Sequence, residues 1–523
     1  MQLLTKTETA VELLDTTLRE GEQTPGVAFM PEEKLEIARL LLTHLRVDRL
    51  EIGSARISDG EQQGVRQIVD WAEKRGFLSA LEMLGFVDGG KSVQWLKNLG
   101  VPTVNLLCKA SERHCRVQLR RSPSRHLDDI VREIEIADQA GLKVNVYLED
   151  WSHGVKENFG FIHAIVQRLK ELPVERIMLA DTLGILTPDQ VTCYLNWMYA
   201  AFGRLKFDFH AHNDYNLATA NALAAVNCGI SGLHGTINGL GERAGNPPIA
   251  QLAVAVNDFT DRRIRITEKE LQHASNLVQN LSGKRCAWNM PVVGRDVYTQ
   301  TCGIHADGDE KGDLYANALR PERFGRERDY ALGKLSGRAS LQQNLELLPE
   351  LPQLSPELRE LVLKEVVRLG DKKKSVTRAD LSFIISGLLQ TPLKNRFQVV
   401  DFELSNRLNR PPKVKVVLKI NDRMIESCAS GDGGYDAFVK AVRKALRPLG
   451  LKLPRLLDYE VRIPPGGRTD ALVETTITWQ FEDGRSLITN GVDCDQMVAA
   501  IRATEKMLNL RLASGDKSAA ENL

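Results

Sequence analysis

Short hydrophobic segments alternate with longer amphipathic segments through the first half of the chain. The stretches between the short segments, such as 31–45 and 217–228, carry apolar residues at the spacing of one helix face. Eight such units in about 250 residues predict a (β/α)8 barrel over 10–270, a fold whose active sites lie where the strands end. The predicted strands span 12–17, 49–53, 80–86, 103–107, 143–148, 176–180, 206–210 and 232–237.

The second half of the chain changes character twice. Residues 271–392 predict a helical linker, and its polar, glycine-rich insertion at 303–312 is expected to be a functional loop. Residues 393–511 alternate strands with helices, which is typical of a separate α+β domain. Its clearest elements are expected at 412–420, 435–449, 471–481 and 496–508. The small, polar residues 512–523 predict a disordered tail.

Composition excludes several classes of protein. The 523 residues are too many for one core, and 69 basic side chains nearly balance 68 acidic ones, so neither a nucleic acid nor an anionic membrane is an expected partner. No apolar run reaches the roughly 20 residues of a membrane helix, and residues 1–10 are too polar for a signal peptide. The eight cysteines form no Cys-x-x-Cys pair. We therefore expect a cytoplasmic enzyme with reduced thiols.

Two histidines lie one residue apart where the seventh predicted strand ends. His210 and His212 share a face of that strand, so both imidazoles can reach one metal ion. Taken alone, such a pair is structural about as often as it is a ligand pair. Two neutral imidazoles leave a divalent ion short of negative charge, and Glu20 at the end of the first strand is the best candidate carboxylate.

A glycine-rich turn, Ser-Gly-Asp-Gly-Gly-Tyr-Asp at 430–436, opens one of the helices of the last domain. Free backbone amides at such a turn can hold a small anion. A turn that only caps the helix is the ordinary interpretation, because glycine commonly serves backbone geometry.

Three long motifs resemble one enzyme family. They are Asp-Thr-Thr-Leu-Arg-Glu-Gly-Glu-Gln at 15–23, His-Ala-His-Asn-Asp at 210–214 and Asn-Gly-Leu-Gly-Glu-Arg-Ala-Gly-Asn at 238–246. In this order they are similar to the metallolyases that include 2-isopropylmalate, homocitrate and citramalate synthases. The resemblance continues through His305 and the segment 458–467, so it covers nearly the whole chain. Within the family it favours the citramalate synthases that carry a C-terminal regulatory domain.

The resemblance implies condensation of acetyl-CoA with a 2-oxoacid and hydrolysis of the thioester. It assigns Glu20, His210, His212 and Asn246 to a divalent metal, which the mixed ligands leave open as Mn, Zn, Mg or Co. Many family members have Asp where this chain has Glu20. Arg19 is expected to neutralise the alkoxide that forms during condensation.

The same resemblance implies a base that deprotonates the acetyl methyl group. It groups four candidate catalytic residues near acetyl-CoA, with His305 as the preferred base because imidazole works near neutral pH. Their individual roles stay open, as does the possibility that the base comes from a neighbouring subunit. The four residues are Glu149, His305, Asp307 and Tyr315.

Three bulky residues are implied around the side chain of the oxoacid: Leu84, Leu107 and Tyr147. They favour pyruvate, with 2-oxobutyrate as a slower substrate, although such residues are also ordinary barrel core. Thr182 is expected to bind the carboxylate of the oxoacid. Other family substrates, 2-oxoisovalerate for an isopropylmalate synthase or the substrate of a homocitrate synthase, stay open, as do an acyl-CoA lyase and a non-catalytic metabolite sensor.

The last domain is implied to form a homodimer and to bind an end-product amino acid. Isoleucine is expected for a citramalate route and leucine for an isopropylmalate route. The candidate regulatory residues come from the glycine-rich turn and one later strand: Gly431, Asp432, Gly433, Tyr435 and Asp458.

Overall fold

The structure is a computed structural model that divides into two compact units. The first comprises residues 1–298 and 317–327, and the second comprises 299–316 and 328–523. Within these bounds, the structure describes 9–203, 205–348, 354–371, 376–389, 396–421, 423–463, 473–482, 484 and 486–513. Residues 464–467 of the family-like segment and 514–523 of the predicted tail therefore lie outside the described residues. No helix among the described residues is long and apolar enough to cross a membrane.

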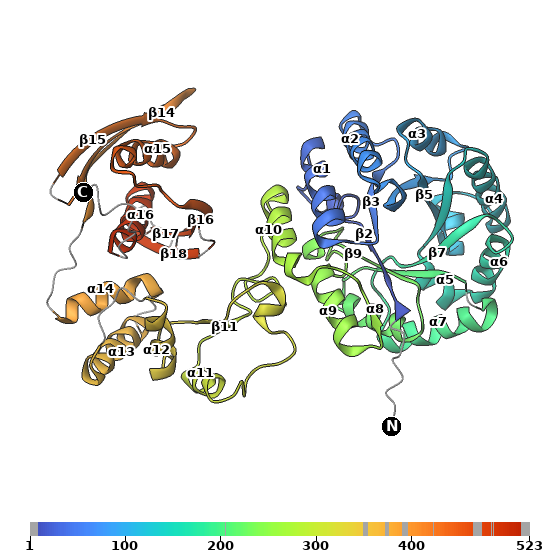
Figure 1. Cartoon of the computed structure of the whole chain (residues 1–523). Coiled ribbons are helices and arrows are strands. Elements are labelled where there is room, and N and C mark those ends of the chain that lie inside the picture. The colour runs from blue at the N-terminus through green and yellow to red at the C-terminus, as the bar shows by residue number, and fades with distance from the viewer. Residues whose placement is uncertain are drawn as a thin grey trace. The chain divides into compact units, whose positions relative to one another are not determined.

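Eight parallel strands close into a barrel in the first unit, as the sequence predicts (Figure 1). Neighbouring strands along the chain pair with each other, and the last pairs with the first through Glu12 and Gly232. The strands are β2 (Glu12–Asp15), β3 (Arg49–Ser54), β4 (Leu81–Phe86), β5 (Thr103–Lys109), β6 (Lys143–Glu149), β7 (Val174–Asp181), β8 (Phe207–Ala211) and β9 (Gly232–Gly235). The prediction of a (β/α)8 barrel is confirmed.

Helices surround the barrel and pack on its outer face (Figure 1). They are α1 (Pro31–Arg39), α2 (Asp59–Arg75), α3 (Lys91–Leu99), α4 (Pro123–Gln139), α5 (Trp151–Glu157), α6 (Phe159–Leu169), α7 (Pro188–Phe202), α8 (Ala218–Asn227) and α9 (Ile249–Phe259). Helix starts follow local chemistry: Thr187 and Gln190 form a capping box before α7. The stretch expected as one helix at 31–45 instead changes to π-helical geometry over Leu40–Leu45 and ends at Arg46, whose φ is 64°.

The barrel contains two cores. A large outer core lies between the strands and helices, and a small apolar cluster of Leu14, Leu84, Tyr147 and Met178 fills the inside. This division follows from strand alternation, since neighbouring residues along a strand face opposite sides. Side chains that face inward near the strand ends therefore line the barrel mouth.

The first unit also contains residues that follow the barrel. Helix α10 (Leu271–Ser282) packs on α1, and the short strand β1 (Thr9–Ala10) pairs with β10 (Arg262–Arg263). Arg323, from the returning segment 317–327, binds Asp258 at 2.8 Å and Glu268 at 2.5 Å. The domain bounds 10–270, 271–392 and 393–511 remain predictions.

The second unit begins with a helical part. Its elements are α11 (Gly303–Glu310), α12 (Arg338–Glu346), α13 (Pro356–Asp371) and α14 (Arg378–Leu389), with the paired short strands β11 (Thr299–Gln300) and β12 (Asp329–Tyr330). The loop predicted at 303–312 is wrong, because most of it forms α11. Its glycines serve close packing: a Cβ on Gly303 would lie 2.8 Å from Gly337 Cα, and one on Gly308 would lie 2.5 Å from the Tyr315 ring.

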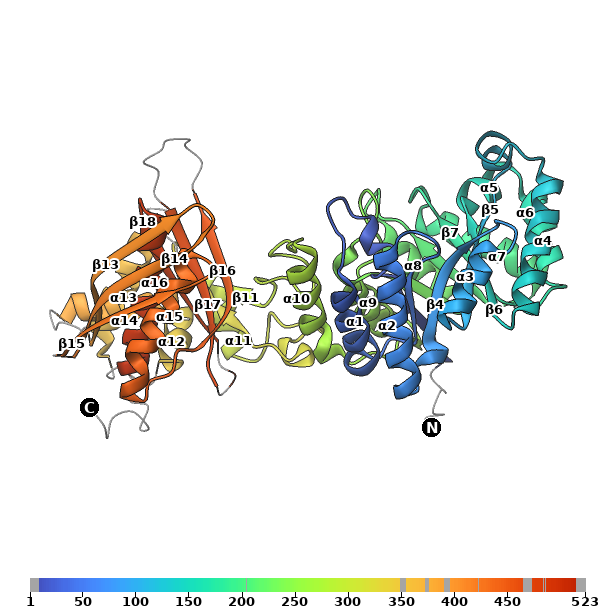
Figure 2. The same cartoon turned by 90° about the horizontal axis from the view of Figure 1, so that it is seen from above.

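Two three-stranded antiparallel sheets and two helices complete the second unit (Figure 2). The sheets order as β13-β14-β15 and β16-β17-β18, α15 packs on β14 and β15, and α16 packs on β17 and β18. The elements are β13 (Phe397–Arg407), β14 (Arg410–Ile420), β15 (Arg423–Ser430), α15 (Gly434–Leu446), β16 (Arg455–Arg462), β17 (Val473–Gln480), β18 (Ser486–Asp493) and α16 (Gln496–Ala513). This confirms the predicted α+β domain.

Candidate active site at the barrel mouth

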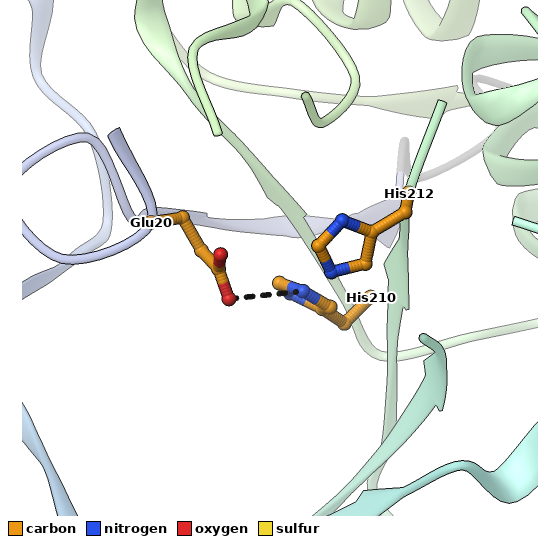
Figure 3. Close-up of side chains that lie close together, drawn as sticks. All are labelled: Glu20, His210 and His212. Atoms are coloured by element: carbon orange, nitrogen blue, oxygen red, sulfur yellow. Dashed lines mark ion pairs between the residues drawn. The ribbon is translucent and has the colours of Figure 1, made fainter. Parts of the chain in front are cut away.

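Glu20, His210 and His212 converge at the mouth of the barrel (Figure 3). Glu20 follows β2, His210 is the fourth residue of β8, and His212 comes directly after that strand. Each residue offers one ligand atom, and these atoms lie within 4.8 Å of one another. Glu20 Oε1 is 3.5 Å from His210 Nε2. The three residues predicted as metal ligands are thus neighbours, and all are buried.

The unpaired polar atoms of this cluster fit a divalent ion. Among the described residues, Glu20 Oε2, His212 Nδ1 and Asn246 Oδ1 are buried without a hydrogen-bond partner. Burial, with the charges of Arg243 and Arg19, lowers the pKa of His212 to about 4, and burial also lowers the pKa of His210. Both imidazoles are therefore neutral near pH 7, the form that binds metals. One carboxylate, two imidazoles and an amide oxygen are donors that divalent first-row metal ions bind.

Arg19 lies directly beside this cluster. Its Nε donates to Glu51 at 2.6 Å, its Nη2 donates to the Tyr147 hydroxyl at 3.2 Å, and its Nη1 pairs with Glu20. Burial opposes the charge of Arg19, but Glu51 and Tyr147 raise its pKa above the ordinary value. The guanidinium is therefore held in place and can stabilise negative charge at the mouth.

The predicted substrate pocket is the inner cluster of the barrel. Leu84 and Tyr147 belong to it, and Leu107 packs against it. Tyr147 connects this cluster to the charged residues. Its ring centroid is 5.5 Å from that of His210, and its hydroxyl accepts a hydrogen bond from Arg19. The apolar wall and the candidate metal ligands thus form one continuous site.

Thr182 follows β7, and Glu149 is the last residue of β6 at the same end of the barrel. Thr182 Oγ1 accepts the backbone N–H of Asp150 at 2.8 Å, so its hydroxyl proton remains for donation to another group. Glu149 forms an ion pair with Lys109 across the ends of β6 and β5. Both predicted residues are near the mouth, and both already have protein partners.

Comparisons with known proteins identify the family of this chain. An "HMGL-like" family model matches residues 10–278, and a "LeuA allosteric (dimerisation) domain" model matches 375–512. A putative (R)-citramalate synthase of Methanopyrus kandleri is 31% identical over 492 residues, covering 94% of each chain. In Methanocaldococcus jannaschii, an (R)-citramalate synthase is 30% identical, covering 96% of this chain and 99% of its own. A 2-isopropylmalate synthase there is 31% identical, covering 97% and 96%.

The chain belongs to the HMGL-like family that includes the citramalate and 2-isopropylmalate synthases. Membership confirms the resemblance inferred from the three motifs and identifies an acyltransferase of the citramalate and isopropylmalate synthase type. The individual site residues, the metal and the preferred oxoacid remain predictions.

Three further residues predicted from the family lie in the second unit. His305 is exposed on α11, and its ring centroid is 4.2 Å from that of Tyr315. Asp307, on the same helix, accepts from Lys311 Nζ at 2.7 Å and lines a cavity of about 590 Å³ between α12 and α13. The contact between His305 and Tyr315 keeps these two candidate catalytic groups together.

The predicted regulatory residues of the family's dimerisation domain lie around the start of α15. A Cβ on Gly431 would lie 2.3 Å from Ala437 N, so close packing requires glycine there. The backbone N–H of Asp432 donates to Asp436 at 3.0 Å. Gly433 is the residue before α15, and Tyr435 contacts Tyr459, the neighbour of Asp458 on β16, at 4.8 Å. One amide of the glycine turn is thus bound by its own helix, which favours the capping interpretation.

Four buried polar residues of this family member were not recognised from sequence. Glu51 receives Arg19 and also accepts from Asn105 at 2.7 Å, and Asn105 in turn accepts from Asn145 at 2.9 Å. His234, taken from sequence as an ordinary structural histidine, lies 3.2 Å from His210. The only available signal was a polar residue inside an apolar strand, since these contacts join strands that are distant in sequence.

Proposed function

We propose that this protein condenses acetyl-CoA with a 2-oxoacid, preferably pyruvate, to give (R)-citramalate and free CoA. The observation that carries the proposal is the convergence of Glu20, His210 and His212 beside Arg19 and the apolar inner cluster of the barrel. Family membership supplies the reaction class. An isopropylmalate synthase acting on 2-oxoisovalerate is the second candidate, because a relative of similar identity carries that name.

Glu20, His210 and His212 would hold a divalent metal, with Asn246 as a fourth ligand through its unpaired Oδ1. When bound, such an ion supplies a Lewis acid and a template for the oxoacid. Mn, Zn, Mg and Co all remain compatible with this mixture of nitrogen and oxygen donors.

Arg19 would bind the oxygen that becomes negative as the new carbon–carbon bond forms. Glu51 and Tyr147 fix the guanidinium in place, so little reorganisation is needed when the charge develops. Thr182 would donate its free hydroxyl proton to the carboxylate of the oxoacid.

Leu84, Leu107 and Tyr147 would surround the methyl group of pyruvate. Leu84 is 4% exposed and Tyr147 is 2% exposed, so neither leaves open space beside the candidate ligands. A longer branched side chain would require displacement of these groups. Such apolar discrimination is worth about 1 to 3 kcal/mol per methylene.

His305 would take the proton from the acetyl methyl group at an imidazole nitrogen. The Tyr315 ring lies against this ring at a centroid distance of 4.2 Å, and Asp307 lies on the same helix, so both would orient the base. Glu149, at the end of β6, is the fourth candidate catalytic residue. Activity recovered by mixing His305→Ala with Glu20→Ala chains would indicate that the base acts across a homodimer.

The C-terminal domain would form the homodimer and bind an end-product amino acid, isoleucine for a citramalate route or leucine for an isopropylmalate route. The match to an allosteric dimerisation domain supports this assignment. Inhibition requires that the effector favour one state of the enzyme, because equal binding to both states shifts no population. The location of this biosynthetic enzyme would be cytoplasmic.

The test is thiol release from acetyl-CoA with four separate oxoacids: pyruvate, 2-oxobutyrate, 2-oxoisovalerate and 2-oxoglutarate. We expect the highest kcat/KM with pyruvate and a lower value with 2-oxobutyrate. Preference for 2-oxoisovalerate would favour the isopropylmalate synthase. No release with any of them would overturn the proposal and favour a lyase or a sensor.

A further inference from the structure

His234 is on β9, the strand next to β8, and lies beside the candidate metal ligand His210. Its side chain is buried, with 1% of the residue exposed. Its Nδ1 is 3.2 Å from His210 Nδ1 and 3.0 Å from the Tyr147 hydroxyl, while its Nε2 is 3.4 Å from Asp208 Oδ2. His234 thus joins a candidate metal ligand to a buried carboxylate. Neither the sequence motifs nor the proposed reaction assigns it a role.

Asp208 fixes which nitrogen of His234 carries a proton. Arg49 and Arg176 both form ion pairs with the Asp208 carboxylate, the latter at 3.0 Å, so the group that faces His234 is a carboxylate between two guanidinium groups. A carboxylate only accepts hydrogen bonds, so Nε2 of His234 is the N–H that faces it. An imidazole with its proton on Nε2 has its lone pair on Nδ1, so Nδ1 of His234 is the acceptor.

This acceptor determines the tautomer of His210. Two unprotonated nitrogens facing each other at 3.2 Å would repel, so Nδ1 of His210 must be the donor. The lone pair of His210 then lies on Nε2, the nitrogen 3.5 Å from Glu20 Oε1 and 3.4 Å from Asn246 Nδ2. Nε2 is therefore the nitrogen able to bind an ion among these residues.

We propose that His234 is a positioning residue that holds His210 in its metal-binding tautomer and orientation. The inference rests on the proposed metal site and deepens it. His234 accepts the His210 Nδ1–H, donates to Asp208, and makes the ligand nitrogen face Glu20. Outer partners of metal-bound histidines act in this way, and their loss typically weakens metal binding by about 10- to 100-fold.

The Tyr147 hydroxyl lies at the same nitrogen, 3.0 Å from His234 Nδ1. The one lone pair of this nitrogen therefore faces two donors, the His210 Nδ1–H and the Tyr147 O–H.

The experiment compares His234→Gln with His234→Leu in the full chain. Glutamine can accept from His210 and donate to Asp208, whereas leucine does neither. Mn²⁺ is titrated into chelator-treated protein, and free Mn²⁺ is measured by electron paramagnetic resonance. We expect the Kd for Mn²⁺ to rise about 10- to 100-fold in the leucine variant and to recover to within about threefold in the glutamine variant.

His163→Leu is the control, because His163 lies on the surrounding helix α6, where its ring contacts Phe202, and its loss should leave the Kd unchanged. Thermal unfolding verifies that each variant is folded. His234→Asn replaces the leucine variant if that chain does not fold, because its shorter amide cannot span both partners and should weaken binding similarly.

The outcomes separate this inference from the proposed function. One Mn²⁺ bound by the wild type, with an unchanged Kd in the folded leucine or asparagine variant, would overturn the role of His234 alone. Equal loss in the glutamine and leucine variants would also overturn it. If neither the wild type nor His163→Leu binds Mn²⁺, the metal site itself is wrong and the inference fails with it.

Discussion

The two ends of the barrel both bury charged residues, but they satisfy them differently. Near the starts of the strands, the Asp208 carboxylate forms ion pairs with Arg49 and with Arg176, the latter at 3.0 Å. Arg49 also forms an ion pair with Glu82 at 3.1 Å. At the mouth, one oxygen of Glu20 and the Nδ1 of His212 have no partner in the described part of the chain. Buried charges near the strand starts are neutralised by opposite charges, whereas atoms able to bind a metal ion remain unpaired at the mouth.

This difference distinguishes a structural network from a functional one. Buried polar groups without partners are costly, so they persist where a ligand completes them. The paired end should therefore support folding, and the mouth should support catalysis. Substitutions at the two ends test this separation.

The largest effect is expected from Glu20→Ala at the mouth. Loss of the carboxylate removes the negative ligand, so thiol release from acetyl-CoA with pyruvate should fall by about 1,000-fold or more, or roughly 4 kcal/mol in the barrier. The free energy of unfolding of the metal-free protein should fall less than in Asp208→Ala, because Arg19 loses its pair with Glu20 but keeps Glu51 at 2.6 Å. Glu242→Ala, an exposed glutamate in a neighbouring motif, is the matched control. A loss below tenfold would show that Glu20 is not a ligand.

Asp208→Ala should act mainly on the fold at the paired end, and on metal binding only through its contact with His234. It leaves Arg49 and Arg176 without their shared carboxylate, so the free energy of unfolding should fall by about 3 kcal/mol. Urea denaturation of the metal-free protein measures this change. An unaltered midpoint would mean that the network does not support the fold.

Leu84→Ala should change specificity by an intermediate amount. The extra space should shift the ratio of kcat/KM for 2-oxoisovalerate over pyruvate upward by about tenfold, since apolar pockets discriminate by roughly 1 to 3 kcal/mol. Met83→Ala is the control, because the neighbouring Met83 faces the outer core. A ratio that moves equally in both variants would point to general loosening of the barrel.

The smallest effect concerns pH. The folded-state pKa of His212 is about 4, below the 6.5 of an ordinary imidazole, so the unfolded chain takes up this proton first as the pH falls. The free energy of unfolding of the metal-free protein should therefore decrease between pH 6.5 and pH 4. His212→Ala should remove roughly 1 kcal/mol of this loss at pH 5.5. Identical pH profiles for the two proteins would contradict the neutral, buried imidazole.

Much of the fold was predictable because apolar segments with polar ends mark barrel strands. The carboxylate and both histidines were predictable because each lies at the end of such a strand, where parallel strands bring side chains together. The helix over Gly303–Glu310 was not, since its glycines reflect contacts with Gly337 and Tyr315 that no local pattern records.

The supporting residues of the site were also beyond sequence. Glu51 accepts a hydrogen bond from Arg19, and His234 contacts His210. Each contact joins residues on or after two strands that a helix separates along the chain. Their identity depends on side-chain direction inside the closed barrel rather than on any motif. Similarly, the sequence could not distinguish an anion-binding turn at Gly431 from a packing glycine, because only the approach of Ala437 reveals the packing.

The most direct test of the central claim is the rate of thiol release from acetyl-CoA and pyruvate as Mn²⁺ is returned to chelator-treated protein. We predict no release above background without the ion and full recovery at one ion per chain. Glu20→Ala should not recover. A full rate without the ion, or equal recovery in Glu20→Ala, would contradict a catalytic metal at the barrel mouth.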